Sequence, residues 1–401
     1  MNNTHLNPSI AIACGGTGGH LFPGIAVAEK LFQRDCEVTL MISPKEVDQQ
    51  AVKNISGMNV VTLPAVGLQR GAELAFLRGF GQSWRAARKS FKSRPPNAVI
   101  AMGGFTSAPP VLAAKACGAR TFLHESNTIP GRANRWLSRV VNRAFVGFPS
   151  AALRLKNSRV TVTGTPVRPC FRPRNAGACR IALGLDPLRP VILVVGGSQG
   201  ATGINQMILE ALPAFSTMAP HFQWLHLAGP NDAEKLKQTY AELNLSAVVH
   251  NFFDEMDLAL GAASAAVSRA GASSLAELAA MRVPSVLVPY PVATDDHQRY
   301  NALAFVETGA ARLLEQKHGS PEILARTILD ITENQDVREQ MQKALSLWQT
   351  PRAADEIAET VLRELAAKMP AWTRLSRSRS ASTSASATPQ LASAIPEEVI
   401  V

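Results

Sequence analysis

The chain has 401 residues and a net charge of +10, and 46 % of its residues are hydrophobic. This length predicts two or three domains, and this composition is sufficient for buried cores. No apolar run reaches the roughly 18–20 residues that a membrane-spanning helix needs, and the first residues lack the pattern of a signal peptide. We therefore expect a cytosolic protein.

The positive charge is concentrated in the first half of the chain. Residues 1–170 contain 21 Lys and Arg against 7 Asp and Glu, a net charge of +14, whereas residues 171–401 have a net charge of −4. This asymmetry predicts that the first half meets nucleic acid, a phosphate-bearing substrate or an anionic membrane surface. The chain has only three tyrosines and no recognised nucleic-acid-binding module, so we expect no nucleic acid as a partner.

Short β-rich runs alternate with helical segments along most of the chain. A first series of buried strands is expected at residues 9–14, 37–41, 60–63, 98–102 and 121–124. A second series is expected at residues 191–195, 223–227, 247–250, 265–267 and 285–289. Such alternation favours parallel sheets with helices on both faces. The predicted fold is therefore α/β, with two Rossmann-like doubly wound domains facing a cleft.

Changes in composition suggest where these domains end. The Pro- and Arg-rich stretch Thr165–Arg174 predicts an interdomain connector. We therefore assign residues 1–165 to a first Rossmann-like domain and residues 166–350 to a second. Residues 351–368 predict a closing helix that packs back on the first domain. Residues 369–401 are rich in Ser and Ala, which predicts a disordered tail.

Glycine-rich turns follow two strands of the predicted first domain. Residues 15–20 (GGTGGH) do not fit a dinucleotide fingerprint, because Leu21 stands where its third glycine would be. Glycines allow a close approach to phosphate, and the start of a helix offers free N–H groups. The turn at Gly103-Gly104 repeats this device. Both turns are therefore candidates for phosphate loops, with a purely structural strand–helix turn as the alternative.

A third turn, residues 196–200 (GGSQG), opens the predicted second domain. It matches the G-x-S-x-G nucleophile elbow of α/β-hydrolases, and His297 is available as the later histidine. A hydrolase does not explain the tandem domain or the first glycine turn. We therefore favour Ser198 as a hydroxyl that binds phosphate.

Seven motifs occur in order between about residues 8 and 367: GGTGGH, MGGFTSAP, LHESN, GTPVR, GGSQGA, SRAGASSLAEL and DDHQRYNA. In this set and order the chain resembles the MurG family, the UDP-N-acetylglucosamine:undecaprenyl-pyrophosphoryl-muramyl-pentapeptide transferases of peptidoglycan synthesis. The resemblance implies the glycosyltransferase-B fold, with the nucleotide sugar mainly in the second domain and the lipid acceptor mainly on the first. It further implies transfer with inversion in one displacement, and a role in cell shape and division.

The resemblance also implies the site residues. His20 corresponds to a general base or an acceptor-positioning group, and an imidazole suits a base because its ordinary pKa lies near neutrality. Donor binding is implied for Thr17, Gly18, Gly19, Asn127, Arg168, Ser198, Phe253, Ala272, Ser273, Ser274, Leu275, Ala276, Glu277 and Gln298. Loops for the acceptor pyrophosphate are implied at Gly15, Gly16, Gly103 and Gly104.

Several of these residues have an implied contact. Asn127 and Gln298 match contacts to the transferred sugar, and Glu277 is suited to the ribose hydroxyls. Phe253 stands where an aliphatic residue often lies against the uracil, so we expect that contact to be partly reshaped or to be made through the backbone alone. Structural alternatives remain open: His20 could cap or pack against the glycine turn, Asn127 could be a turn residue, Glu277 a solvated carboxylate and Arg168 a partner in a connector salt bridge.

No D-x-D motif is present, and the five cysteines are scattered without a zinc spacing. We therefore expect no metal and no other cofactor, with the leaving UDP stabilised by backbone N–H groups, Ser198 and Arg168. The expected partners are UDP-N-acetylglucosamine, a lipid-linked muramyl-peptide acceptor, other proteins of cell-wall synthesis and an anionic membrane. We expect a peripheral protein on the cytoplasmic face of the inner membrane.

The segment Leu74–Arg94 predicts a basic amphipathic helix. One face is apolar and carries Leu77, Phe80, Trp84 and Phe91. A neighbouring stripe is basic and carries Arg78, Arg85 and Lys92. This pattern suits docking in a membrane interface. The alternative is that the apolar face packs on the sheet and the basic stripe is only solvated.

Two related activities share the expected fold. A UDP-N-acetylglucosamine 2-epimerase would use the same cleft and nucleotide but no lipid acceptor. A glycosyltransferase that acts on a natural product would not need affinity for a membrane. Both leave the charge of the first half without a role.

Overall fold

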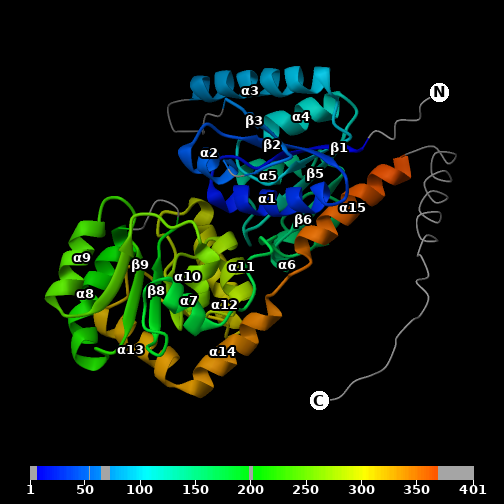
Figure 1. Ribbon diagram of the computed structural model, residues 1–401. Helices are drawn as coiled ribbons and strands as arrows, with labels where there is room; N and C mark the ends of the chain where they lie inside the picture. The colour runs from blue at the N-terminus through cyan, green and yellow to red at the C-terminus, as the bar shows by residue number, and fades with distance from the viewer. Residues whose placement is uncertain (1–6, 54, 65–72, 198–201, 369–401) are drawn as a thin grey trace, which may run out of the picture. The chain divides into compact units, whose positions relative to one another are not determined.

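The computed structural model describes residues 7–53, 55–64, 73–197 and 202–368. Residues up to Ala358 form one compact unit, which contains both β-sheets (Figure 1). The second unit begins at Glu359 and is described only as the end of helix α15 (Ala353–Lys368). Ser198 and the predicted disordered tail, residues 369–401, lie outside the described residues.

In the described part of the chain, the first sheet has seven parallel strands in the order β3-β2-β1-β4-β5-β6-β7. These strands are β1 (Ser9–Ala13), β2 (Glu37–Ile42), β3 (Asn59–Thr62), β4 (Ala98–Ala101), β5 (Arg120–Glu125), β6 (Arg143–Val146) and β7 (Val160–Val162). The helices between them are α1 (Gly18–Phe32), α2 (Glu46–Val52), α3 (Glu73–Ser93), α4 (Ala108–Ala116), α5 (Arg132–Leu137) and α6 (Pro149–Ala152). The strand order reverses between β1 and β4, where a doubly wound sheet opens a crevice.

The second sheet has six parallel strands among the described residues, in the order β10-β9-β8-β11-β12-β13. These strands are β8 (Val191–Val195), β9 (Gln223–Leu227), β10 (Ser246–His250), β11 (Ala265–Ser268), β12 (Ser285–Leu287) and β13 (Arg312–Leu313). The helices are α7 (Ala176–Ala182), α8 (Thr202–Met218), α9 (Ala233–Glu242), α10 (Met256–Ala262), α11 (Ala272–Met281), α12 (His297–Glu307), α13 (Pro321–Glu333) and α14 (Gln335–Leu347), with a 3₁₀ turn, η1 (Thr294–Asp296). Here the order reverses between β8 and β11, which gives a second crevice.

The predicted α/β fold with two doubly wound domains is confirmed. Each predicted strand is present, and its ends differ from the prediction by at most two residues. The prediction missed β6, β7 and β13, which have four, three and two residues. Runs this short carry too little periodicity to be separated from loops.

Close packing holds the start of α1 against the ends of β1 and β2. A Cβ atom at Gly24 of α1 would lie 2.5 Å from the Cβ atom of Cys14, and one at Gly15 would lie 2.3 Å from the backbone nitrogen of Ser43. Such distances are far shorter than van der Waals contact, so both positions require glycine. These glycines therefore serve the packing of the first domain.

Helix α3 uses most of its apolar face for packing inside the first domain. Phe91 is 3 % exposed, and Phe80 and Trp84 pack against the same core. Only Leu77 of the predicted membrane-facing set is strongly exposed, at 63 %, together with Leu74 at 83 %. The predicted apolar membrane face is therefore wrong for Phe80, Trp84 and Phe91. Nor is any helix in the described residues long and apolar enough to span a membrane.

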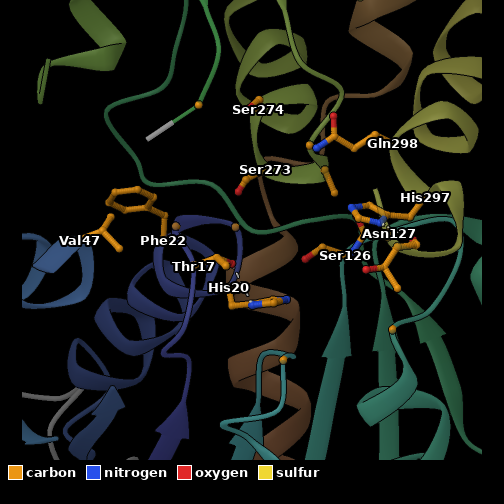
Figure 2. Close-up of a pocket in the computed structure, with 18 of the residues that line it drawn as sticks. Thr17, His20, Phe22, Val47, Ser126, Asn127, Ser273, Ser274, His297 and Gln298 are labelled. Carbon is orange, nitrogen blue, oxygen red and sulfur yellow. Dashed lines mark hydrogen bonds between the residues drawn. The ribbon is translucent and has the colours of Figure 1, made fainter. Parts of the chain in front are cut away.

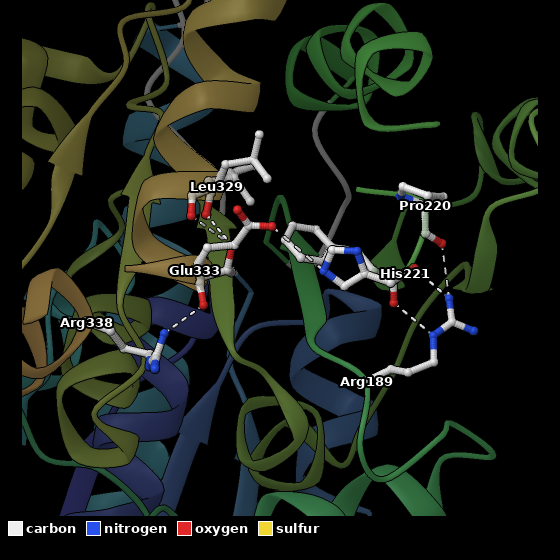
Figure 3. Close-up of polar contacts among 9 residues, drawn as sticks. Arg189, Pro220, His221, Leu329, Glu333 and Arg338 are labelled. Atoms are coloured by element: carbon white, nitrogen blue, oxygen red, sulfur yellow. Dashed lines mark hydrogen bonds and ion pairs between the residues drawn. The ribbon is translucent and has the colours of Figure 1, made fainter. Parts of the chain in front are cut away.

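In the second domain, Arg189 closes the turn between α8 and β9 (Figure 3). Its guanidinium donates to the carbonyl oxygens of His221, at 2.8 Å, and Pro220, at 3.2 Å. Glu333 at the end of α13 lies 3.8 Å from the His221 imidazole, and Arg338 of α14 donates to the carbonyl of Thr332. These contacts hold the turn between α8 and β9 against the end of α13, and the end of α13 against α14.

The first turn of α15 contacts the first domain. Asp355 lies 2.7 Å from Arg34 and 3.2 Å from Lys30, both at the end of α1. Lys30 lies in the last turn of α1 and Arg34 lies two residues beyond its end. Positive charge at this end of a helix interacts favourably with the helix dipole. How the rest of the closing helix packs stays a prediction.

Candidate active site

A cleft of about 1540 Å³ is lined by loops that follow strands of both sheets (Figure 2). The predicted site residues that line it are Thr17, Gly18, Gly19, His20, Gly104, Asn127, Arg168, Phe253, Ala272, Ser273, Ser274, Glu277 and Gln298. Gly15, Gly16, Gly103, Leu275 and Ala276 do not line it. Leu275 is 1 % exposed and packs in the core of the second domain, so a direct donor contact by its side chain is not supported.

The first glycine turn is held from below by a buried carboxylate. Asp48 of α2 accepts hydrogen bonds from the backbone N–H of Gly16, at 2.7 Å, and from the N–H and hydroxyl of Ser43, at 3.0 and 2.6 Å. Lys45 donates to the carbonyl of Gly16 at 2.8 Å. Gly16 therefore has no N–H left for a phosphate, contrary to the expectation that it forms part of an anion loop. The N–H groups of Gly18 and Gly19, at the start of α1, remain free of partners within the helix.

His20 projects from the first turn of α1 into the cleft and is half-buried (Figure 2). Its Nδ1 atom lies 3.1 Å from the hydroxyl of Thr17. The ring packs on the backbone of the second glycine turn, where a Cβ atom at Gly103 would lie 2.7 Å from the imidazole and one at Gly104 would lie 3.2 Å from it. The second turn therefore supports the histidine, and both of its glycines have positive φ, +115° and +74°.

The environment of His20 favours the neutral imidazole. Burial is the main cause that lowers the pKa of His20 to about 4; the Asp48 carboxylate opposes the shift, and His297 and Lys45 add to it. The sequence suggested a value near neutrality, and the difference is the loss of water around the ring. A neutral imidazole can accept a proton at physiological pH, so this environment is compatible with a base.

A second buried carboxylate organises the loop after β5. Glu125 accepts hydrogen bonds from the backbone N–H groups of Asn127, at 2.8 Å, and Gly131, at 2.9 Å, and from the side-chain amide of Asn134, at 2.9 Å. Burial raises the pKa of Glu125, and these hydrogen bonds oppose that shift. The buried His124 likewise bonds the carbonyl of Gly164 at 3.0 Å. Both residues therefore support the loop.

The second domain presents the start of helix α11 to the cleft. Leu275 donates the first intrahelical hydrogen bond, to the carbonyl of Gly271 at 3.0 Å, so the N–H groups of Ala272, Ser273 and Ser274 have no partner within the helix. The hydroxyl of Ser273 is buried and has no hydrogen-bond partner. Free N–H groups, an unpaired hydroxyl and the positive end of the helix dipole together form a site for an anion.

Arg168 and Glu277 lie at the base of this anion site. The Arg168 guanidinium stacks on the rings of Phe22, at 4.8 Å, and Phe171, at 5.2 Å, and its Nε atom is buried without a partner. Burial raises the pKa of Glu277 to about 7, although the charge of Arg168 acts in the opposite direction. No salt bridge to an acidic side chain is present for Arg168 among the described residues, so its charge is available to an anion.

Phe253 and Gln298 lie on the same wall of the cleft. The Phe253 ring packs on the His250 ring, with centroids 5.0 Å apart, and presents an apolar surface to the cleft. Gln298 accepts a hydrogen bond from the backbone N–H of Tyr290 at 3.0 Å, which leaves its amide N–H groups for a ligand. No three His, Cys, Asp or Glu side chains in the described ranges lie close enough together to hold a metal ion.

Two doubly wound domains that share a cleft, with helix starts and an arginine lining it, fit the class of two-domain glycosyltransferases. Comparison with sequence families agrees. Residues 10–146 match the glycosyltransferase family 28 N-terminal domain, and residues 191–357 match the family 28 C-terminal domain.

Individual relatives narrow the assignment. The chain is 36 % identical over 364 residues to a protein of Anaeromyxobacter dehalogenans (strain 2CP-C) named UDP-N-acetylglucosamine--N-acetylmuramyl-(pentapeptide) pyrophosphoryl-undecaprenol N-acetylglucosamine transferase; this covers 88 % of the chain and 91 % of the relative. The solved structure of Acinetobacter baumannii MurG is 26 % identical, with a TM-score of 0.69, and the match covers 89 % of this chain and 99 % of that one. The chain therefore belongs to glycosyltransferase family 28 and, within it, to the MurG family.

A putative UDP-N-acetylglucosamine 2-epimerase from Listeria monocytogenes has a similar structure, with a TM-score of 0.65 at 15 % identity over 88 % of this chain and 95 % of that one. At that identity the likeness shows the shared fold alone.

Sequence reasoning missed three residues that the fold brings to the site: Asp48, His297 as a neighbour of His20, and Asn301. Asp48 and Asn301 are completely buried, and each has partners far away in the sequence: Gly16 lies 32 positions from Asp48, and Asn127 lies 174 positions from Asn301. Asn301 does fall in the DDHQRYNA motif. Its place in that motif was the one signal from which a role at the site could have been predicted.

Replacement of His20 by Ala tests the proton acceptor. We expect turnover at saturating substrates to fall by about 10²-fold or more, because placement of a general base contributes 10²–10⁴-fold. Affinity for UDP, measured by calorimetry, should change much less, since the anion site lies on the other domain. Gly103→Ala is a second variant, because its Cβ would displace the ring; wild-type turnover in both variants would remove His20 from the reaction.

The raised pKa of Glu277, about 7, predicts a pH dependence of UDP binding. A carboxylate accepts ribose hydrogen bonds better than a carboxylic acid does, so affinity should be highest above pH 7 and should fall as the pH drops through about 7. Glu277→Gln should lower affinity by about tenfold above pH 7, since charge-assisted bonds contribute roughly 1.5–3 kcal/mol. It should also flatten the pH profile. UDP titrates equally in both proteins, so parallel pH profiles would show that Glu277 does not touch the ribose.

Proposed function

We propose that the chain transfers N-acetylglucosamine from UDP-N-acetylglucosamine to undecaprenyl-pyrophosphoryl-N-acetylmuramyl-pentapeptide, with inversion at the anomeric carbon. Membership of the MurG family supports the substrates. The single observation that supports the chemistry is the arrangement of the two walls. An anion site built from the α11 start and Arg168 lies across one cleft from a neutral imidazole.

The leaving UDP gains negative charge as the glycosidic bond breaks. The N–H groups of Ser273 and Ser274, the unpaired Ser273 hydroxyl and the Arg168 guanidinium can bond diphosphate oxygens where that charge develops. These groups are already oriented by helix α11 and by the stacking of Arg168, so little reorganisation accompanies the reaction. They support a leaving-group site built from the chain's own residues.

The acceptor hydroxyl loses its proton as it attacks the anomeric carbon. When Nδ1 of His20 carries the ring proton, it donates a hydrogen bond to the Thr17 hydroxyl. The Nε2 atom then keeps a lone pair that can accept the proton of the acceptor hydroxyl. The pKa of about 4 reflects burial of the His20 ring and the charges of the neighbouring side chains. A bound pyrophosphate would raise it, because a nearby negative charge favours the imidazolium.

The first-domain side of the cleft suits a lipid-linked acceptor. Beyond His20 it extends along apolar side chains of α2, α3, α5 and the second glycine turn: Val47, Ala51, Phe76, Phe80, Phe105 and Trp136. Lys53 and Arg132 also line it, and their charges suit a pyrophosphate. This combination of apolar surface and cations supports an acceptor that joins a diphosphate to a hydrocarbon chain.

We further propose that the enzyme works at the cytoplasmic face of the inner membrane as a peripheral protein. The exposed stripe of α3 contains Arg78, Arg85, Arg88, Lys89 and Lys92. Each cation near an anionic surface contributes about 1 kcal/mol, and the exposed Leu74 and Leu77 give a small apolar contact. The proposed docking is therefore mainly electrostatic.

Product analysis tests the transfer. The full chain is incubated with UDP-N-acetylglucosamine and a short-chain lipid-linked muramyl-pentapeptide, with and without a chelator. We expect a disaccharide product in both conditions, formed only when the acceptor is present. Consumption of the donor without an acceptor would indicate an epimerase or a hydrolase and would contradict the proposal.

Sedimentation with vesicles tests the docking. Wild-type protein should bind vesicles that contain anionic lipid at low salt and release at high salt, because salt screens exposed charges. Changing Arg78, Arg85 and Lys92 to Glu should abolish most of this binding. The matched control changes Lys235, Lys237 and Lys343 of the second domain to Glu, an equal change in net charge. Equal loss in both triple variants would assign docking to net charge and reject a role for α3.

A further inference from the structure

Asn301, in the second turn of α12, contacts both domains at once. Its side chain is completely buried, with 0 % exposure. The side-chain oxygen accepts hydrogen bonds from the backbone N–H and the hydroxyl of Thr128, each at 2.9 Å. The side-chain nitrogen donates to the carbonyl of Ala270, at 3.1 Å, and to the side-chain oxygen of Asn127, at 3.0 Å. One amide therefore joins the loop after β5 to the loop after β11.

The orientation of this amide follows from its backbone partners. The N–H of Thr128 can only donate, so the atom facing it must be the oxygen of Asn301. The carbonyl of Ala270 can only accept, so the atom facing it must be the nitrogen. A flipped amide would oppose both groups, which leaves a single orientation.

The hydrogen bonds continue from Asn301 into the parts of the site that the two domains contribute, which we call the two half-sites. On the first domain, Asn127 donates from its amide to Glu125 at 3.1 Å, and Glu125 holds the rest of its loop. On the second domain, Ala270 directly precedes Gly271, the N-cap of α11. The anion site at the α11 start and the loop that carries Asn127 (Figure 2) are thus held in one register.

Other contacts also join the two domains in the described part of the chain, among them an exposed ion pair and an apolar cluster. Arg135 pairs with Asp295 at 2.5 Å, but their side chains are 42 % and 36 % exposed. An exposed pair of this kind typically contributes only about 0–1 kcal/mol. Phe148 packs against Phe305 and Trp348, which is apolar and non-directional. The Asn301 amide, by contrast, supplies directional bonds in a dry environment, where geometry matters most.

We propose that Asn301 is a positioning residue that holds the donor and acceptor half-sites at the separation needed for transfer. The proposal rests on the proposed transferase function. Asn301 is buried beneath the site and does not reach the cleft, so it acts through Asn127, Thr128 and the α11 N-terminus. Loss of the bridge should leave each half-site able to bind its own ligand while the reacting atoms are misaligned. A misalignment of about 1 Å can lower the rate by about 10²-fold.

Asn301→Asp tests this role in the full chain. The carboxylate keeps acceptors for Thr128, but it places oxygen against the carbonyl of Ala270 and the side-chain oxygen of Asn127. We expect kcat to fall by about 10²-fold, while UDP affinity by calorimetry changes less than threefold. Hydrogen exchange at the Thr128 amide should become faster, because repulsion between the new carboxylate oxygen and the carbonyl of Ala270 pushes the side chain out of the bridge.

Asn157→Asp is the matched control. Asn157 also donates its amide to backbone carbonyls, those of Ser138 and Val141, but both lie in the first domain. It should lose comparable thermal stability while keeping kcat and the exchange rate of Thr128. If Asn301→Asp fails to fold, Thr128→Val removes one cross-domain bond without changing side-chain shape, and an intermediate fall in kcat is expected.

Unchanged kcat in folded Asn301→Asp or Thr128→Val would overturn the positioning role. Unchanged exchange at the Thr128 amide of Asn301→Asp would show that the bridge does not form in solution. A wild-type protein that transfers no sugar would instead overturn the proposed function, and the exchange result would still decide whether Asn301 joins the two domains.

Discussion

The proposed site for the leaving diphosphate depends on which backbone N–H groups of the cleft are free. On the first domain, buried carboxylates already occupy the loop N–H groups: Asp48 takes that of Gly16, and Glu125 takes those of Asn127 and Gly131. On the second domain, the first N–H groups of α11 have no partner within the helix. The N–H groups of Gly18 and Gly19 also stay free on the first domain, but only the start of α11 combines free N–H groups with the Ser273 hydroxyl and the Arg168 guanidinium in the described part of the chain.

The packing of the second glycine turn explains why the first domain can carry a neutral histidine. Packing of the His20 ring on Gly103 and Gly104 removes water from it, and desolvation favours the uncharged form. Asp48 below the turn limits this shift without forming a salt bridge to the ring. Glycines that looked like phosphate loops thus create the environment of His20, the proposed base, and their lack of a Cβ is needed for contact with the imidazole.

The fold could be predicted because buried parallel strands are continuous apolar runs, and ten such runs separated by helical patterns leave few alternatives. The site could be predicted only in outline. Periodicity places Phe80, Trp84 and Phe91 on one face of α3, but it cannot distinguish a face that packs on a core from one that enters a membrane. Asp48 and Asn301 were missed for another reason: each satisfies distant backbone groups, and only the folded chain brings those partners together.

A site divided between two domains also needs a means of holding its halves together. Apolar contact between Phe148 and Phe305 favours association of the domains but tolerates sliding, because the hydrophobic effect has no direction. A buried amide is different, since any shift that breaks its bonds leaves polar groups unpaired in a dry interior, at a cost of about 1–3 kcal/mol each. The four hydrogen bonds of Asn301 reach both domains. They therefore favour one relative position of the two domains and disfavour positions shifted slightly from it. The interaction that aligns donor and acceptor is therefore polar, although the cores of both domains are apolar.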